Sequence, residues 1–322
     1  MSWGIYTGSG KPHDGVDALP APPPWRVFLG RPVRPVPPPS TVHSDVVRAT
    51  TYRPDARTVQ QVNAALYLRR PLLVTGPPGT GKTTLAYAVA HELRLGPVLR
   101  WSISSQATLR DGLYQYDPLS RLQEAGQGAG EDLGRFLRLG PLGTALLPWS
   151  RPRVLLIDEI DKSDLDLPND LLTAFEDGSY EIPELVRANT PTASVLDAGG
   201  ELRAQITGGK VLCHSFPLVI MTSNGEREFP PAFLRRCITV EIRQPTGPEL
   251  NAIVAAHLPE HVAAAGAVVE QFLARRSAGE LATDQLLNAI YLTQATGAAD
   301  PHALAEDLMP YLSSALPEPD AD

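Results

Sequence analysis

One glycine-rich stretch constrains the fold of this chain more than any other part of the sequence. Residues 76–83 read Gly-Pro-Pro-Gly-Thr-Gly-Lys-Thr and fit the phosphate-loop pattern G-x-x-x-x-G-K-[ST] at every fixed position. The apolar residues 71–75 predict a buried strand before the loop, and the Ala- and Leu-rich residues 83–93 predict a helix after it. A strand that leads through glycines into a helix N-terminus forms an anion site, because backbone N–H groups and the helix dipole face the phosphates. The stretch therefore predicts a nucleotide-binding α/β domain.

The phosphate-loop pattern also assigns roles to single residues. We expect the Lys82 ammonium group to reach the β- and γ-phosphates and the Thr83 hydroxyl group to ligate Mg²⁺. A nucleoside triphosphate with Mg²⁺ is therefore the expected ligand. The residues predicted to contact it are Gly76, Pro77, Pro78, Gly79, Thr80, Gly81, Lys82, Thr83 and Thr84.

A second apolar run, Val154 to Ile157, ends in the adjacent acids Asp158 and Glu159. A run without polar residues is typical of a central parallel strand, and open α/β sheets bind ligands at the carboxyl ends of their strands. We expect Asp158 to hold Mg²⁺ and Glu159 to be the general base that orients and polarises the attacking water. The alternative is a pair of solvated acids at a strand end.

Strand and helix patterns alternate along the middle of the chain. Helices are predicted at residues 58–69 and 168–177, and strands at residues 98–103, 218–221 and 238–242. Such alternation predicts a parallel sheet with helices on both faces. After residue 245 only Ala- and Leu-rich helical patterns remain, with Thr246 as a possible first cap, and they continue to about residue 314.

The order of four segments is similar to that of the AAA+ ATPases. The segments are GPPGTGKT, VLLIDEIDK, IMTSN ending at Asn224, and FLRRC containing Arg235 and Arg236. The resemblance implies that ATP is the nucleotide and that Asn224 is the sensor-1 residue, which helps to hold the attacking water. It also implies that Arg236, or Arg235 in its place, is an arginine finger for the neighbouring subunit's site. Two idle surface cations at a helix end are the alternative for this pair.

The resemblance implies an α/β fold: an AAA+ P-loop NTPase parallel sheet sandwiched by helices, followed by a small α-helical lid domain. The expected organisation has four parts. They are a proline-rich N-terminal leader at residues 1–50, the AAA+ α/β nucleotide-binding domain at 51–244, the helical lid at 245–316 and an acidic tail at 317–322.

Three further segments resemble the MoxR and McrB branch of AAA+ proteins: residues 113–117, 140–143 and 167–172. That resemblance implies an insertion at residues 102–140 and a β-hairpin at residues 181–214. It also implies a homo-oligomeric ring, most simply a hexamer, and a chaperone-like action on a partner protein such as a von Willebrand factor A-type protein. McrB-like motors ordinarily use GTP, and the chain has no guanine-specific N-K-x-D run, so a GTP-dependent motor for a nuclease stands as a further alternative.

One departure from the family pattern lies in the expected lid. Related lids carry a sensor-2 arginine near the start of their third helix, whereas residues 281–286 read Leu-Ala-Thr-Asp-Gln-Leu. Either Arg275 or Arg276 substitutes for it, or lid closure does not sense the γ-phosphate in the usual way. Slow, partner-stimulated hydrolysis would fit this departure. So would the rival function, an ATP-controlled assembly switch or scaffold in a defence or signalling system with weak intrinsic hydrolysis.

Nine prolines between Pro20 and Pro39 dominate the leader. Such a segment has little to bury, so it is expected to be extended or disordered unless it lies on another surface. Apolar residues within it favour docking, and a loose leader is the equal alternative. The apolar residues are Trp25, Val27, Phe28 and Leu29.

Composition limits the remaining possibilities. The formal net charge of −8 gives no global basic field, so nucleic acid is not an expected partner. No run approaches the roughly 18 apolar residues of a membrane span, and the first 15 residues lack an apolar signal core. Cys213 and Cys237 are expected to be small buried hydrophobic residues. These features fit a cytoplasmic protein.

Two other polar groups receive structural interpretations. His257 and His261 have metal-ligand spacing, but Pro259 lies between them and no third ligand is evident. Three acids that follow the Asp158–Glu159 pair lack the glycine and terminal glutamate of a calcium loop, and they are expected to be solvated acids and helix caps near the nucleotide. They are Asp161, Asp164 and Asp166.

Overall fold

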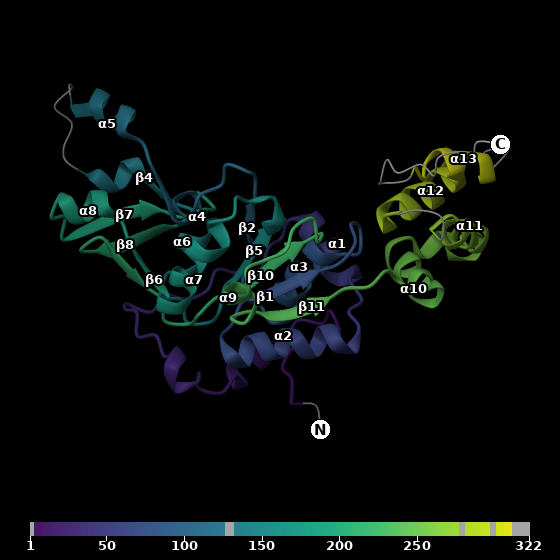
Figure 1. Cartoon of the computed structure of the whole chain (residues 1–322), viewed down its shortest axis with the longest axis horizontal. Helices are drawn as coiled ribbons and strands as arrows, with labels where there is room; N and C mark the ends of the chain where they lie inside the picture. The colour runs from purple at the N-terminus through teal and green to yellow at the C-terminus, as the bar shows by residue number, and fades with distance from the viewer. Residues whose placement is uncertain (1–2, 126–131, 277–280, 297–300, 311–322) are drawn as a thin grey trace. The chain divides into compact units, whose positions relative to one another are not determined.

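The structure is a computed structural model of the whole chain, and it describes residues 3–125, 132–276, 281–296 and 301–310 (Figure 1). The chain forms two compact units. The larger unit comprises Met1–Thr50, Pro54–Thr75 and Thr83–Val240, and the smaller one comprises Thr51–Arg53, Gly76–Lys82 and Glu241–Asp322.

A five-stranded sheet forms the centre of the larger unit, in the order β11-β1-β10-β5-β2. The pairs β1–β10, β10–β5 and β2–β5 are parallel, and β5 and β10 are buried along their whole lengths. Full burial of apolar strands follows from cover on both faces, so the predicted α/β fold class is confirmed. The strands are β1 (Leu72–Thr75), β2 (Leu99–Ser102), β5 (Val154–Asp158), β10 (Leu218–Ser223) and β11 (Ile238–Glu241).

Helices cover this sheet, and α2 contacts β1, as Figure 1 shows. The first of the predicted helices, α2, begins after Asp55, whose side chain accepts a hydrogen bond from Thr58 N, and ends at Arg69 in the left-handed conformation. Both helices predicted at residues 58–69 and 168–177 are confirmed. The helices that precede or connect its strands are α1 (His43–Thr51), α2 (Ala56–Leu68), α3 (Lys82–Glu92), α6 (Pro141–Ala145), α7 (Leu167–Asp177) and α9 (Pro231–Leu234).

A second, six-stranded sheet has the order β3-β4-β7-β8-β9-β6. It confirms the predicted hairpin, because β7 and β8 pair in antiparallel register within residues 181–214. The insertion at residues 102–140 contributes β3 and β4 to the same sheet, which the sequence did not predict. The elements of this region are β3 (Tyr114–Tyr116), β4 (Leu137–Leu139), β6 (Ser179–Glu181), β7 (Thr192–Leu196), β8 (Arg203–Thr207), β9 (Lys210–Leu212), α4 (Leu109–Leu113), α5 (Pro118–Ala125) and α8 (Pro183–Arg187).

One apolar core joins the two sheets. Trp149, Leu155 and Phe175 are almost fully buried within it, together with the free thiols of Cys213 and Cys237. The expectation that both cysteines are small buried residues is confirmed. Burial raises the pKa of each thiol to about 12, because a thiolate would lose its hydration there.

The proline-rich leader packs against the rest of the larger unit, although mostly not through the predicted residues. Only Phe28 of the four apolar side chains packs against the core, whereas Trp25 is 74% exposed. Arg26 is buried instead: its guanidinium group donates twice to Arg69 O and lies 4.5 Å from the ring centroid of Phe216. A buried arginine is tolerated here because carbonyl oxygens and aromatic faces replace its water. Helix α1 and short 3₁₀ turns at Gly15–Ala18 and Pro24–Arg26 also belong to this segment.

The smaller unit contains a helical group around its own apolar core. Leu250, Phe272 and Leu286 are buried in this core. The predicted cap at Thr246 is confirmed, because Thr246 and Glu249 form a capping box at the first helix. No strand follows Glu241 in residues 242–276, 281–296 or 301–310, and the expected helix end near residue 314 lies outside the described residues. The helices are α10 (Gly247–His257), α11 (Gly266–Arg276), α12 (Thr283–Thr296) and α13 (Pro301–Asp307), with a 3₁₀ turn at Pro259–Ala264.

Among the described helices, none combines the length and the apolar character that a membrane crossing requires.

Candidate nucleotide-binding site

The phosphate loop connects β1 to α3 through glycines in left-handed conformations. Gly79 has φ of 71° and Gly81 has φ of 86°, values that other L-residues rarely adopt. A Cβ atom on Gly79 would lie 2.3 Å from the Cβ atom of Ala282, which directly precedes α12. The loop is therefore shaped both by backbone conformation and by close packing within the smaller unit.

Lys82, the first residue of α3, is directed back into the loop. Its side chain is largely buried, and Nζ donates to Gly76 O at 2.7 Å and to Pro77 O at 2.8 Å. Thr80 closes the same turn with a hydrogen bond from Oγ1 to Pro77 O. The loop thus holds a cation at the start of a helix, which is the electrostatic environment that a polyphosphate requires.

Asp158 and Thr83, the two residues that we expect to hold Mg²⁺, lie together. Thr83 Oγ1 donates to Asp158 Oδ1 at 2.8 Å, and Asp158 is 6% exposed at the end of β5. A hydroxyl group and a carboxylate at one point are hard oxygen donors, which suit Mg²⁺. The two residues therefore fit the metal-binding roles that we assign to them.

Two further residues, which the sequence did not single out, also bind the Asp158 carboxylate. Thr222 Oγ1 donates to Asp158 Oδ1 at 2.8 Å, and Arg100 Nη2 lies 2.7 Å from Oδ2. Arg100 comes from β2, where Ser102 is the register partner of Asp158. An arginine at one position of a four-residue strand carries no motif, so no sequence signal could have identified it.

Glu159 turns the chain sharply at the end of β5. Its φ of 62° is in the left-handed region, and its N–H group donates to Thr222 Oγ1 at 2.9 Å. The side chain is 44% exposed and pairs with Lys162 at 2.9 Å, a hydrogen bond that raises the pKa of Lys162. A non-glycine residue held in this conformation supports a functional role, since the surrounding contacts must stabilise its strain.

The turn that contains Asn224 is fixed by a buried carboxylate. Asp161 Oδ2 accepts hydrogen bonds from Ser223 Oγ, Asn224 N and Glu226 N, at distances of 2.8–3.2 Å. Asp161 is 5% exposed, and within the described residues its other oxygen has no hydrogen-bond partner. Since β10 and β5 are neighbouring parallel strands, Asn224 leaves the same sheet edge as Glu159.

The prediction that the three acids are solvated or cap helices is therefore wrong for Asp161 and confirmed for Asp164 and for Asp166, which is exposed. Asp164 Oδ1 accepts hydrogen bonds from the N–H groups of Asp166 and Leu167 and so closes the first turn before α7. Asp161 differs because the turn after β10 folds over it and supplies three donors from residues about 60 positions further along the chain.

Arg236 and Arg235 lie near the start of β1, at the ends of the strands that are opposite to Asp158. Arg236 forms an ion pair with Glu176 and lines a cavity of about 270 Å³ together with Pro71, which directly precedes β1. Asp158 lies at the other ends of the parallel strands, so neither arginine is grouped with its own acids. Arg235 is exposed, and its side chain has no hydrogen bond or ion pair with the described residues.

The two arginines considered as sensor-2 substitutes bind backbone carbonyls of the smaller unit. Arg275 Nη2 donates to Met309 O at 3.2 Å, and Arg276 Nη1 donates to Pro245 O at 2.7 Å. Arg276 also lies 5.8 Å from the ring centroid of Phe272. Both side chains thus have structural contacts inside the helical group.

Comparisons with known proteins place this geometry in a family. The family model for the ATPase family associated with various cellular activities (AAA) matches residues 72–246. No curated protein matches the sequence significantly. Among solved structures, the chain is similar to the Thermotoga maritima RuvB Holliday junction branch migration motor, with a TM-score of 0.40 and 15% identity over 79% of this chain and 68% of that chain. A single-substitution variant of RuvB matches with the same score and identity over 78% and 66%. Because the family match extends from β1 through the phosphate loop and both acids to the cap of α10, and covers more than half of the sequence, the chain belongs to the AAA family of ATPases.

Proposed function

We propose that this protein is a Mg²⁺-dependent AAA+ ATPase that works as a ring and couples ATP binding and hydrolysis to the remodelling or activation of a partner protein. The observation that carries this proposal is the 2.8 Å hydrogen bond between Thr83 and Asp158. It joins the residue after the phosphate-loop lysine to the acid at the end of β5, a buried strand of the same parallel sheet, and this is the pair that a nucleotide-bound metal needs.

Each residue of the site then has a distinct task. Lys82 binds the β- and γ-phosphates, while Thr83 and Asp158 hold Mg²⁺, which when bound neutralises charge on the phosphate oxygens. Glu159 orients the attacking water and accepts its proton, and Asn224 holds the same water by a side-chain hydrogen bond. Asp161 has no contact with the nucleotide in this scheme and positions Asn224 through the backbone.

The position of the two arginines supports the proposal of a ring. Arg236 and Arg235 are near the sheet edge opposite to Asp158, so they can serve a site in a neighbouring copy but not the acids of their own chain. We assign the finger to this pair and a homo-oligomer, most simply a hexamer, to the working state. Resemblance to MoxR proteins supports a chaperone-like role and a von Willebrand factor A-type partner.

The test is ATP turnover per protomer over a wide range of protein concentration. Turnover per protomer is expected to rise with concentration, because each site is completed by another copy. Arg236→Ala should abolish the rise while ATP still binds, and Arg235→Ala is the matched variant that shows which arginine is the finger. Constant turnover per protomer from dilute to concentrated solution, unaffected by either substitution, would exclude the shared site.

The helical group favours a second function, an ATP-controlled assembly switch or scaffold with weak intrinsic hydrolysis. Residues 281–286 contain no arginine, and Arg275 and Arg276 donate to backbone carbonyls instead. Glu159→Gln distinguishes the two functions, since it should stop hydrolysis without preventing ATP binding. A motor loses its effect on the partner, whereas a switch held in the ATP state stays assembled and constitutively active. Competition between ATP and GTP for binding tests the base preference in the same protein.

A further inference from the structure

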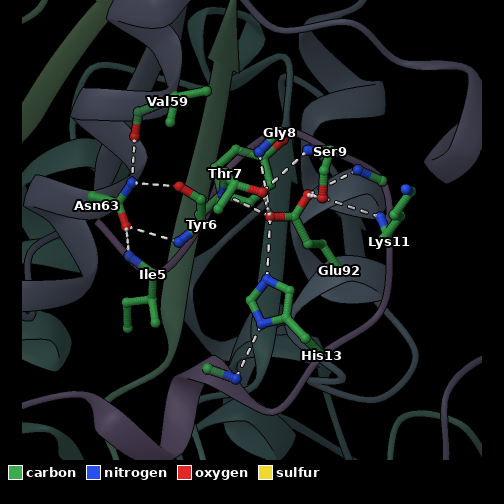
Figure 2. A network of polar contacts seen from close by, with 12 residues as sticks. Ile5, Tyr6, Thr7, Gly8, Ser9, Lys11, His13, Val59, Asn63 and Glu92 are labelled. Carbon is green, nitrogen blue, oxygen red and sulfur yellow. Dashed lines mark hydrogen bonds and ion pairs between the residues drawn. The ribbon is translucent and has the colours of Figure 1, made fainter. Parts of the chain in front are cut away.

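The last residue of α3 binds the N-terminal segment of the chain, residues 3–13, here called the strap. Figure 2 shows the Glu92 carboxylate surrounded by strap groups. It accepts hydrogen bonds from the N–H groups of Thr7 at 2.6 Å, Gly8 at 3.2 Å and Gly10 at 2.9 Å. The Thr7 and Ser9 hydroxyl groups donate to the same carboxylate, and His13 Nε2 lies 3.4 Å from it. Glu92 is 0% exposed, so these donors replace its water.

A second buried side chain binds the preceding strap residues. Asn63, in the middle of α2, accepts hydrogen bonds from the N–H groups of Ile5 and Tyr6 and donates to Tyr6 O at 2.8 Å (Figure 2). Both Asn63 and Tyr6 are 1% exposed. Two side chains from two helices thus satisfy the backbone of consecutive strap residues, in the manner of a protein that binds a peptide.

The strap also fits its surroundings closely. A Cβ atom on Gly4 would lie 2.4 Å from Asn63 Nδ2, and one on Gly8 would lie 2.6 Å from Pro54 Cγ. Gly8 additionally has φ of 73°, which other residues adopt with strain. The two glycines therefore let the strap backbone reach the polar side chains that bind it.

The two helices that bind the strap both lead to the phosphate loop. Helix α2 leads into β1 and so to the phosphate loop, and α3 begins at Lys82, the phosphate-loop lysine. The strap joins Asn63 in α2 to Glu92 at the far end of α3. A shift of α3 along its axis would move Lys82 and Thr83. Such a shift must either break the hydrogen bonds between Glu92 and the strap or move the strap together with the helix.

We propose that the strap is a positioning element for the nucleotide site: its docking on Asn63 and Glu92 and the binding of nucleotide at the phosphate loop stabilise each other. The inference rests on the proposed function, because it needs a nucleotide at the loop. Coupling of two binding events is reciprocal, so the factor by which nucleotide strengthens docking equals the factor by which docking strengthens nucleotide binding.

The test uses the full-length chain and measures both sides of this relation. Amide hydrogen exchange at residues 5–10 reports docking, with and without Mg²⁺ and a non-hydrolysable ATP analogue, and calorimetry gives the affinity for the analogue. Nucleotide should slow exchange of the strap amides. Gly8→Ala should free these amides and weaken nucleotide binding by a similar factor, on the order of 10-fold. Lys11→Ala is the matched strap control, because that side chain is exposed, and it should change neither quantity.

Two results would overturn the proposal in distinguishable ways. If Gly8→Ala frees the strap amides but binds the analogue as tightly as the wild type, the coupling is wrong and the proposed function is untouched. If the wild type binds no nucleotide while its strap amides are protected, the proposed function fails and the coupling fails with it. Thr7→Val removes the hydroxyl group that donates to Glu92 and accepts from Ser9 N, and it provides the same comparison should Gly8→Ala fail to fold.

Discussion

The hydroxyl group of Thr222 donates a 2.8 Å hydrogen bond to Oδ1 of Asp158, across two neighbouring parallel strands. The same hydroxyl oxygen accepts a 2.9 Å hydrogen bond from the N–H group of Glu159. One side chain on β10 therefore orients the acid to which we assign the metal and fixes the backbone of the residue assigned as general base.

Thr222→Val should reduce ATP turnover and destabilise the protein. The substitution keeps the shape of the side chain but leaves the Glu159 N–H group without its acceptor, at a cost of about 1–3 kcal/mol for a buried unpaired donor. Turnover assays and urea unfolding measure the two effects. Thr222→Ser retains the hydroxyl group and should stay close to the wild type in both. A valine variant with wild-type turnover would show that this hydroxyl group does not position the acids.

Asp161→Asn should lower kcat and leave nucleotide affinity unchanged. The carboxylate accepts three hydrogen bonds from the turn that carries Asn224, and hydrogen bonds to a charged group contribute about 1.5–3 kcal/mol each. Single-turnover kinetics together with equilibrium binding separate the two quantities. Asp164→Asn is the matched control, since it removes a nearby acid that only closes the turn before α7. Equal effects of the two substitutions would argue against a special role for Asp161.

Gly79→Ala should abolish nucleotide binding more completely than backbone strain alone explains. The residue has φ of 71°, and its new Cβ atom would approach that of Ala282 to 2.3 Å. Gly208→Ala is the matched control, because that glycine has φ of 58° and an added Cβ atom would meet nothing within 4 Å. The control should therefore lower the free energy of unfolding only by the strain of an alanine in the left-handed conformation, about 1–2 kcal/mol. Calorimetric titration measures the nucleotide affinity of both variants, and thermal unfolding measures their stability. Similar nucleotide affinities of the two variants would exclude the steric explanation.

Cys213 and Cys237 should resist alkylation in the folded protein. With a thiol pKa of about 12 instead of the ordinary 9.0, the thiolate fraction at pH 8 falls from about 10% to about 0.01%. Labelling by iodoacetamide, followed by mass spectrometry, should therefore be about 1,000-fold slower than in urea. Fast labelling of either residue without denaturant would contradict the buried positions.

The same shift has a consequence for stability at alkaline pH. The pKa of each thiol is raised on folding, so the stabilising contribution is complete below pH 9.0 and is lost as pH rises from there toward about 12. Cys213→Ala should make this alkaline decrease shallower, which urea unfolding at a series of pH values will show. An identical pH profile for the variant would assign the decrease to other groups.

The parts of the fold that the sequence predicted are those set by local pattern. The strand before the phosphate loop, the run that ends in Asp158 and Glu159, and the cap at Thr246 all depend on neighbours within a few residues. The second sheet depends on pairing between β4 and β7, which are more than 50 residues apart, and no local pattern specifies that pairing.

The same distinction separates the residues of the site. Thr83 and Asp158 belong to motifs, and each motif fixes its own place at a strand end. Asp161 and Asp164 both follow the Asp158–Glu159 pair, and no local pattern tells them apart. Asp161 is buried because the turn after β10 folds over it. Arg100 and Glu92 bind partners more than 50 residues away, so their roles are visible only in the structure.

The ion pair between Arg236 and Glu176 changes what salt can do to an assembly of these chains. An arginine that already has a carboxylate partner exchanges one anion for another when it reaches a phosphate in a neighbouring copy. Dissolved ions weaken the old contact as well as the new one, so the net electrostatic gain depends on ionic strength less than it would for an unpaired arginine. Ring formation that relies on Arg236 would therefore tolerate salt better than ring formation that relies on the exposed Arg235.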